Sequence, residues 1–219
     1  MIEILPSILE PTIERVHEKI QMLEGLVTTA HIDVMDGVFV PSKTDFLPGD
    51  LVHLDTSLAL ELHLMVAEPE KVAANWGRDS HVSRVLVHAE AVHDIDTIAD
   101  KIHAMNKQVG VVVNIGTSLS ALGEVIPHSQ AVQFMGIHRV GFGGEHFEES
   151  ILPVIRELRR ASRVLISVDG GINAKTAQMC VKVGATRLVV GSYLFNASSK
   201  KEMRTRIDTL ERLDQEKEQ

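Results

Sequence analysis

Short runs of apolar, largely β-branched residues alternate along this chain with longer amphipathic stretches, and eight such runs recur over its length. Several of them, such as 164–168 and 188–190, are almost continuously apolar. Such runs are typical of parallel strands that are covered by helices on one face and by a core on the other. The strand ends recur every ~20–35 residues, which is the length of one strand–helix unit. The pattern therefore predicts an α/β fold, a closed (β/α)8 TIM barrel.

An open, doubly wound sheet is the alternative fold. It usually has fewer strands and a G-x-G-x-x-G sequence after the first strand, which this chain lacks. No linker or shift in composition divides the chain, so we expect 1–219 to form a single barrel domain with a frayed end at 214–219. The predicted strands are 2–8, 29–34, 59–65, 84–88, 110–114, 131–137, 164–168 and 187–190. The predicted helices are 11–24, 68–77, 93–106, 118–126, 146–160, 173–183 and 198–214, with a shorter one near 48–55.

The composition narrows the class of partner. The chain is 44% hydrophobic over 219 residues, carries a net charge of −8 and has no block of Lys or Arg, which argues against nucleic acid. No apolar stretch approaches the ~18 residues of a membrane span, and the N-terminus does not resemble a signal peptide. We therefore expect a cytoplasmic protein with no membrane partner. A phosphorylated small molecule remains compatible with the acidity, because glycine loops and helix N-termini bind phosphate without side-chain charge.

His31 and Asp33 are the most unusual pair in the predicted strands. They lie two residues apart in an otherwise apolar strand, so both side chains point to the same face. Burying both costs stability unless a partner such as a divalent metal pairs with them. His63 and Asp169 lie near the ends of two further predicted strands, where the chemistry of a barrel is found. Each residue alone has an ordinary interpretation as a core histidine or a turn aspartate. Together they predict a site for Zn, Fe, Mn or Co.

Three glycine clusters follow late strands of the predicted barrel. Glycine lets backbone N–H groups approach an anion closely, and the helices that follow add a partial positive charge. In barrels of this kind phosphate is often bound after the seventh and eighth strands. Ordinary turns are the alternative for any single cluster, but the three together predict a phosphate site. Its residues are Gly141, Phe142, Gly143, Gly144, Gly170, Gly171, Gly191 and Ser192.

Four other residues lie close to the predicted ligands. Met35 and Met65 each follow a ligand by two residues on the same strand face, so they either fill the core or form an apolar wall that excludes water from the site. Asp36 precedes Gly37, which favours a role in a turn over catalysis. His88, at the end of the fourth predicted strand, is either a hydrogen-bond partner of the site or a satisfied core histidine.

These residues, in this order, resemble the ribulose-phosphate 3-epimerase family over nearly the whole chain. The resemblance implies a metal ion bound by His31, Asp33, His63 and Asp169, with Asp33 and Asp169 also serving as the acid/base pair. It implies sugar contacts from Ser7 and His63, phosphate held by the three glycine loops, and a homo-oligomer. The matching segments are Pro6-Ser-Ile-Leu9, His31-Ile-Asp-Val-Met-Asp-Gly37, Phe39-Val-Pro41, His63-Leu-Met65, His88-Ala-Glu90, Asn114-Ile-Gly-Thr117, Gly141-Phe-Gly-Gly144, Val168-Asp-Gly-Gly-Ile-Asn173 and Gly191-Ser192.

The activity that the resemblance implies is inversion of C3 of D-ribulose 5-phosphate to give D-xylulose 5-phosphate. Two carboxylates would transfer the proton through an enediolate that a metal ion helps to stabilise. The chain departs from the family pattern in the loops 38–50 and 138–145 and at Ile115, where the family usually has proline. These departures leave two alternatives open, an epimerase for another ketose phosphate, such as a six-carbon one, and a non-catalytic sugar-phosphate-binding barrel. A decarboxylase of the related barrels would need an Asp-x-Lys sequence on a strand, and we find none on the predicted strands.

Overall fold

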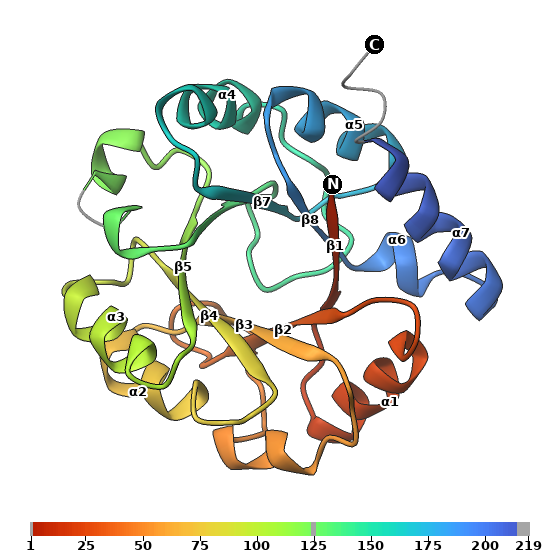
Figure 1. Ribbon diagram of the computed structural model, residues 1–219, viewed down its shortest axis with the longest axis horizontal. Helices are drawn as coiled ribbons and strands as arrows, with labels where there is room; N and C mark the ends of the chain where they lie inside the picture. Colours follow the sequence, from red (N-terminus) through yellow and green to blue (C-terminus); the bar gives the residue numbers. More distant parts are fainter. Residues whose placement is uncertain (1, 124–125, 214–219) are drawn as a thin grey trace.

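The computed structural model describes residues 2–123 and 126–213, and within them eight parallel strands close into a barrel. Each strand pairs with its neighbour in sequence, and β8 pairs back onto β1 through Glu3–Arg187 to Pro6–Val190. Figure 1 shows the strands around a central axis, with the helices on the outside. The (β/α)8 barrel predicted from the sequence is therefore confirmed, whereas the predicted fraying of 214–219 lies outside the described residues.

All eight predicted strands are present, with ends shifted by a few residues. They are β1 (Glu3–Ile8), β2 (Thr29–Met35), β3 (Ala59–Met65), β4 (Val82–His88), β5 (Gln108–Val113), β6 (Ala131–Met135), β7 (Leu165–Asp169) and β8 (Arg187–Val190). The α-helices are α1 (Ile13–Leu23), α2 (Pro69–Trp76), α3 (Ile95–His103), α4 (Ile151–Ala161), α5 (Ala174–Val183), α6 (Ser192–Phe195) and α7 (Lys200–Glu211), and a 3-10 helix, η1 (Pro48–His53), precedes β3.

The helix predicted over 118–126 is wrong. The segment after β5 instead forms two short 3-10 helices, η2 (Leu119–Leu122) and η3 (Ile126–His128). Gly123 and Pro127 explain the difference, because glycine weakens a helix and proline removes a backbone donor and disfavours helical geometry in the residue before it. The helix predicted over 146–160 begins only at Ile151, and the short helix α6 was not predicted.

The two faces of each strand meet different surroundings. On β2, Ile32 and Val34 belong to the large core between the strands and the outer helices. His31 and Asp33 alternate with them and therefore point into the barrel. The same alternation holds on β3, where Leu62 and Leu64 pack outward. On these two strands the inward positions are thus the ones that carry the polar side chains.

Part of the barrel interior is filled by an apolar cluster of Leu86, Val112, Met135 and Ile137. Gly110 makes room for this cluster, because a Cβ atom at that position would lie 2.1 Å from the Leu86 Cδ2 atom. Leu86 is fully buried, so it has little space into which to move.

In the described part of the chain, no helix is long and apolar enough to cross a membrane.

We predict that Gly110→Ala destabilises the protein by about 1–3 kcal/mol, because the added methyl overpacks the barrel interior. Gly49→Ala is the matched control, since a Cβ there meets nothing within 4 Å. Its effect should stay within about 0.5 kcal/mol. Urea unfolding of both variants measures the difference, and equal free energies of unfolding would contradict this view of the interior.

Candidate metal centre and substrate cavity

His31, Asp33, His63 and Asp169 meet at one point inside the barrel. β2 supplies the first two, β3 supplies His63, and Asp169 is the last residue of β7. All four side chains are buried, and each offers one ligand atom within 4.8 Å of the ligand atoms of the other three. Strands far apart in the sequence therefore bring together the four residues that the sequence predicted as metal ligands.

The distances within this cluster suit a small divalent ion. The His63 Nδ1 atom lies 2.8 Å from Asp33 Oδ1 and 3.6 Å from Asp169 Oδ2. The His31 Nε2 atom lies 3.6 Å from Asp33 Oδ1 and 3.8 Å from Asp169 Oδ2. Ligand atoms of a four-coordinate ion with bonds of about 2.0–2.2 Å are separated by roughly 3.3–3.6 Å. Three of the four distances are close to this spacing, and the fourth, from His63 to Asp33, is that of a hydrogen bond, which an ion would replace. Two imidazole nitrogens and two carboxylate oxygens are a ligand set that fits a first-row divalent metal.

The remaining ring nitrogens also favour a metal site. The His31 Nε2 atom is buried and has no hydrogen-bond partner within the described residues, whereas its Nδ1 atom lies 2.9 Å from Glu61 Oε1. The His63 Nε2 atom lies 2.9 Å from His88 Nε2. His88 is therefore a hydrogen-bond partner of the site, which decides between its two sequence interpretations. Each imidazole is held by one nitrogen and presents the other to the cluster, as metal-binding histidines do.

Hydrogen bonds also orient both carboxylates. The Ser7 hydroxyl donates to Asp33 Oδ2 at 2.8 Å, and the Gln133 side-chain amide donates to Asp169 Oδ2 at 3.2 Å. Gln133 is fully buried on β6 and was not among the predicted site residues. The sequence feature that could have predicted it is a single polar residue in an otherwise apolar strand.

The surroundings shift the pKa values of the two carboxyl groups in opposite directions. Burial raises the pKa of Asp169 to about 7, with a further contribution from the negative charge of Asp33. Burial alone would also raise the pKa of Asp33, but the neighbouring imidazoles of His31 and His63 hold it well below its usual range. The cluster therefore gives the two carboxyl groups different proton affinities, with Asp169 the one that takes up a proton more readily. Such a divergence is a common property of acid and base pairs.

Protonation of His31 opposes binding of an ion. Burial alone would lower the pKa of this imidazole, but the neighbouring carboxylates of Asp33 and Glu61 raise it to about 10. A proton and a metal ion compete for the same Nε2 atom, so an ion that binds there displaces a proton. Binding of a metal should therefore strengthen as the pH rises.

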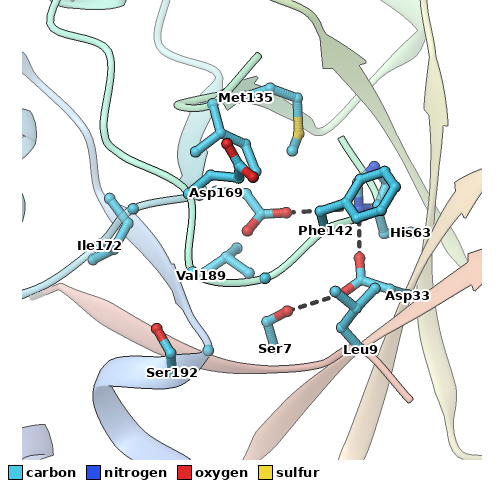
Figure 2. A pocket seen from close by; sticks show the side chains of 18 of the residues that line it. Ser7, Leu9, Asp33, His63, Met135, Phe142, Asp169, Ile172, Val189 and Ser192 are labelled. Atoms are coloured by element: carbon cyan, nitrogen blue, oxygen red, sulfur yellow. Dashed lines mark hydrogen bonds and ion pairs between the residues drawn. The ribbon is translucent and has the colours of Figure 1, made fainter. Parts of the chain in front are cut away.

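A cavity of about 250 Å³ opens above this cluster. Asp33, His63 and Asp169 line it, as does Ser7, and Figure 2 shows these side chains reaching into it from different strands. All eight residues predicted to bind phosphate line the same cavity, namely Gly141, Phe142, Gly143, Gly144, Gly170, Gly171, Gly191 and Ser192. The structure thus joins the cluster and the three glycine loops in one space.

Gly171 shows why this wall of the cavity needs glycine. Its φ angle of 69° lies in the left-handed region, and a Cβ atom there would lie 2.8 Å from the backbone of Phe147. Gly170 and Gly171 follow the end of β7, and α5 begins at Ala174 behind the Asn173 cap. The loop therefore turns sharply while its backbone stays at the cavity surface, where N–H groups can approach an anion.

The methionines are divided between the cavity and the packing behind it. Met65 lines the cavity, and so does Met135, which was not assigned to the site from the sequence. Met35 is not among the described residues that line the cavity. It packs with Val40 and Met65 and lies close to Gly141. Of the two alternatives for Met35, core filling or an apolar wall at the substrate site, this packing corresponds to the first, and it supports the loop that contains Gly141.

One charged residue of the cavity, Lys19, was also missed. Lys19 on α1 and Glu145 both line the cavity. Glu145 forms an ion pair of 3.2 Å with Arg139, which offsets a negative charge beside the predicted phosphate site. Lys19 lies 3.2 Å from Glu10. A lysine on a helix surface is common in any protein, so the sequence alone did not indicate that Lys19 lies at the cavity.

The turn role predicted for Asp36 is confirmed. Its carboxylate accepts hydrogen bonds from the backbone N–H groups of Val38, Phe39 and Ala67, each at 2.8 Å. These bonds connect the loop after β2 to the loop after β3. The Ser42 hydroxyl then donates to the carbonyl oxygen of Gly141 at 3.0 Å, so the loop after β2 also holds the first glycine cluster.

Comparisons with known proteins agree with this geometry. The model described as the ribulose-phosphate 3 epimerase family matches residues 3–195. The ribulose-phosphate 3-epimerase of Bacillus subtilis (strain 168) is 34% identical over 209 residues, which cover 92% of this chain and 95% of that protein. The enzyme of the same name from Synechocystis sp. (strain PCC 6803) is 34% identical over 204 residues, covering 90% of this chain and 88% of that protein.

A solved structure supports the fold alone. The crystal structure of KGPDC from Streptococcus mutans superposes with a TM-score of 0.73 at 14% identity, covering 97% of this chain and 99% of that one. Fold and site together define a barrel enzyme with a buried His/Asp cluster beneath glycine loops. The chain belongs to the ribulose-phosphate 3-epimerase family.

We predict that the metal-free protein binds one Co²⁺ or Zn²⁺ ion per chain and that His31→Gln removes most of this affinity, because the substituted side chain cannot supply the Nε2 atom. His81→Gln is the matched control, since His81 pairs with Asp79 away from the cluster. The affinity of the wild-type protein should rise with pH as the proton on His31 is displaced. Titration calorimetry at several pH values measures all three, and equal affinity in the two variants would contradict the site.

Proposed function

We propose that this protein is a metal-dependent epimerase that inverts C3 of a ketose phosphate and converts D-ribulose 5-phosphate to D-xylulose 5-phosphate. The observation that carries the proposal is the divergence of Asp33 and Asp169, two buried carboxyl groups of opposite protonation preference that share one cavity. Membership of the ribulose-phosphate 3-epimerase family supports the same reaction.

In the proposed reaction the two carboxyl groups act from opposite faces of C3. One carboxylate removes the C3 proton, and the other carboxyl group returns a proton to the opposite face of the enediolate. Asp33, whose pKa is held low, and Asp169, whose pKa is raised to about 7, differ in proton affinity in the sense that this exchange needs. Their states are reversed after each turnover, so the reverse reaction uses the same pair. Ser7 and Gln133 hold the two carboxyl groups in place.

The other residues of the cavity serve this step in the proposal. His31, Asp33, His63 and Asp169 would hold one divalent ion, Zn, Fe, Mn or Co, which acts as a Lewis acid toward the substrate oxygens. The backbone N–H groups of the three glycine loops would bind the phosphate group, which fixes the sugar above the carboxyl pair. Met65 and Met135 give the cavity an apolar wall, which limits access of water to the enediolate. His63 and Ser7 would contact the sugar.

An epimerase for another ketose phosphate is the second candidate. The chain departs from the family pattern within the loops 38–50 and 138–145, and Glu145, one of the departing residues, lines the cavity. Such a departure would alter the surroundings of the substrate while leaving the His/Asp cluster intact. Turnover across five-carbon and six-carbon ketose phosphates decides between the candidates, and we expect D-ribulose 5-phosphate to have the highest kcat/KM.

The expectations about assembly and location stay predictions. The resemblance implies a homo-oligomer, and the sequence predicts a cytoplasmic protein. Sedimentation of the purified protein tests the first, and fractionation of the source cells tests the second.

We predict that Asp33→Asn and Asp169→Asn each lower kcat by about 10²–10⁴-fold, because each removes one of the two groups that carry the proton. Asp96→Asn is the control, since Asp96 is an exposed residue of α3. Epimerisation is followed in D₂O by NMR, with the bound metal measured in each variant. Wild-type protein should incorporate one deuterium at C3 per turnover.

Two outcomes would contradict the proposal. Wild-type protein that holds a metal ion but neither epimerises a ketose phosphate nor exchanges its C3 proton would support the non-catalytic alternative. Wild-type turnover by either asparagine variant would remove that carboxyl group from the proposed pair.

A further inference from the structure

Glu61 is a fully buried carboxylate that the proposed reaction does not use. It lies on β3 two residues before His63, so both side chains point into the barrel. It is absent from the described lining of the substrate cavity. A buried carboxylate is costly unless it is paired and hydrogen-bonded, so its surroundings should show why it is there.

Three side chains from three other strands surround Glu61. Its Oε2 atom accepts a hydrogen bond from Arg84 Nη1 at 2.6 Å and lies 2.7 Å from Arg187 Nη2. Its Oε1 atom lies 2.9 Å from His31 Nδ1. Arg84 is on β4, Arg187 on β8 and His31 on β2. The carboxylate therefore joins a pair of buried arginines to one predicted metal ligand.

The direction of the bond to His31 follows from its partners. A guanidinium group only donates, so a carboxylate paired with two of them is an ionised acceptor. The hydrogen atom between Glu61 and His31 then belongs to His31 Nδ1. In the neutral imidazole this leaves the lone pair on Nε2, which is the buried atom without a hydrogen-bond partner in the described chain and the one that faces Asp33 and Asp169.

We propose that Glu61 is a positioning residue for the metal site: it holds His31 as the Nδ1–H tautomer and aims its Nε2 atom at the ion, while Arg84 and Arg187 hold Glu61. This inference rests on the metal site of the proposed function. It adds that the strength of metal binding is set in part by the ion pairs that Glu61 forms with Arg84 and Arg187. A carboxylate behind a metal-binding histidine orients the ring and makes it a stronger ligand.

The variant Glu61→Gln changes this arrangement in a definite way. The two arginines can only donate, so we expect the new amide to turn its oxygen toward them and its NH₂ group toward His31. The His31 Nδ1 atom then accepts a hydrogen bond, and the ring proton moves to Nε2. The ion loses that ligand atom, although the shape of the side chain is almost unchanged.

Glu3 offers a matched control. Its Oε2 atom accepts a hydrogen bond from Arg187 Nε at 2.7 Å, so it is paired with the same arginine. None of its hydrogen bonds or ion pairs within the described residues involves His31. Glu3→Gln therefore removes a negative charge from the same ion-pair group without touching the bond to the metal ligand.

The test titrates metal-free wild type, Glu61→Gln and Glu3→Gln with Co²⁺, whose visible absorption reports both binding and coordination. We expect Glu61→Gln to bind Co²⁺ roughly 10–100-fold more weakly with an altered spectrum, and Glu3→Gln to keep the wild-type affinity and spectrum. Urea unfolding of the metal-free proteins records the structural cost of each change. Wild-type affinity in Glu61→Gln, or an equal loss in Glu3→Gln, would overturn the proposal.

A second measurement uses the wild-type protein, so it holds even where Glu61→Gln does not fold. Two-bond ¹H–¹⁵N correlation spectra of the Zn²⁺-loaded protein report the tautomer of each histidine, and the His31 signals are identified by their loss in His31→Gln. We expect a proton on Nδ1 and none on Nε2, and the opposite pattern would overturn the proposal. Wild-type protein that binds no Co²⁺ would overturn the metal site as well. Protein that binds it without epimerising any ketose phosphate would overturn only the proposed function.

Discussion

The interior of a closed eight-stranded barrel is only wide enough to be filled by side chains, so each polar group that points inward must find its partner there. In this protein that constraint organises the structure from one end of the barrel to the other. Glu61 is paired with Arg84 and Arg187 and also with His31. The apolar cluster around Leu86 fills part of the remaining space. The His/Asp cluster of the candidate site is therefore continuous with the ion pairs that satisfy the interior.

The same constraint gives two aspartate side chains, Asp33 and Asp169, different pKa values. Asp33 is held between His31 and His63, which keep its pKa well below the usual range although burial acts in the opposite sense. Asp169 is also buried, and burial together with the charge of Asp33 raises its pKa to about 7. Residues brought from β2, β3 and β7 thus create the chemical asymmetry on which the proposed proton transfer depends. The glycine loops at the mouth supply a place for the substrate phosphate in the proposal.

Much of the fold and the cluster could be predicted because their signals are local. The alternation of apolar runs and amphipathic stretches predicted the barrel, and the two-residue spacing of His31 and Asp33 placed them on one strand face. Pairings between distant strands have no local signal, so the partners of Glu61 and the contact between Gln133 and Asp169 appear only in the folded chain. The helix predicted over 118–126 failed because Gly123 and Pro127 outweighed an apolar pattern that was too short.

A crystal structure of the protein with Co²⁺ and a ketose phosphate, using anomalous scattering to locate the ion, tests the central claim most directly. We predict one strong peak at bonding distance, about 2.0–2.2 Å, from His31, Asp33, His63 and Asp169, with the two carboxyl groups on opposite faces of C3. An ion bound elsewhere, or both carboxyl groups on the same face of the sugar, would contradict a metal-dependent two-base epimerase.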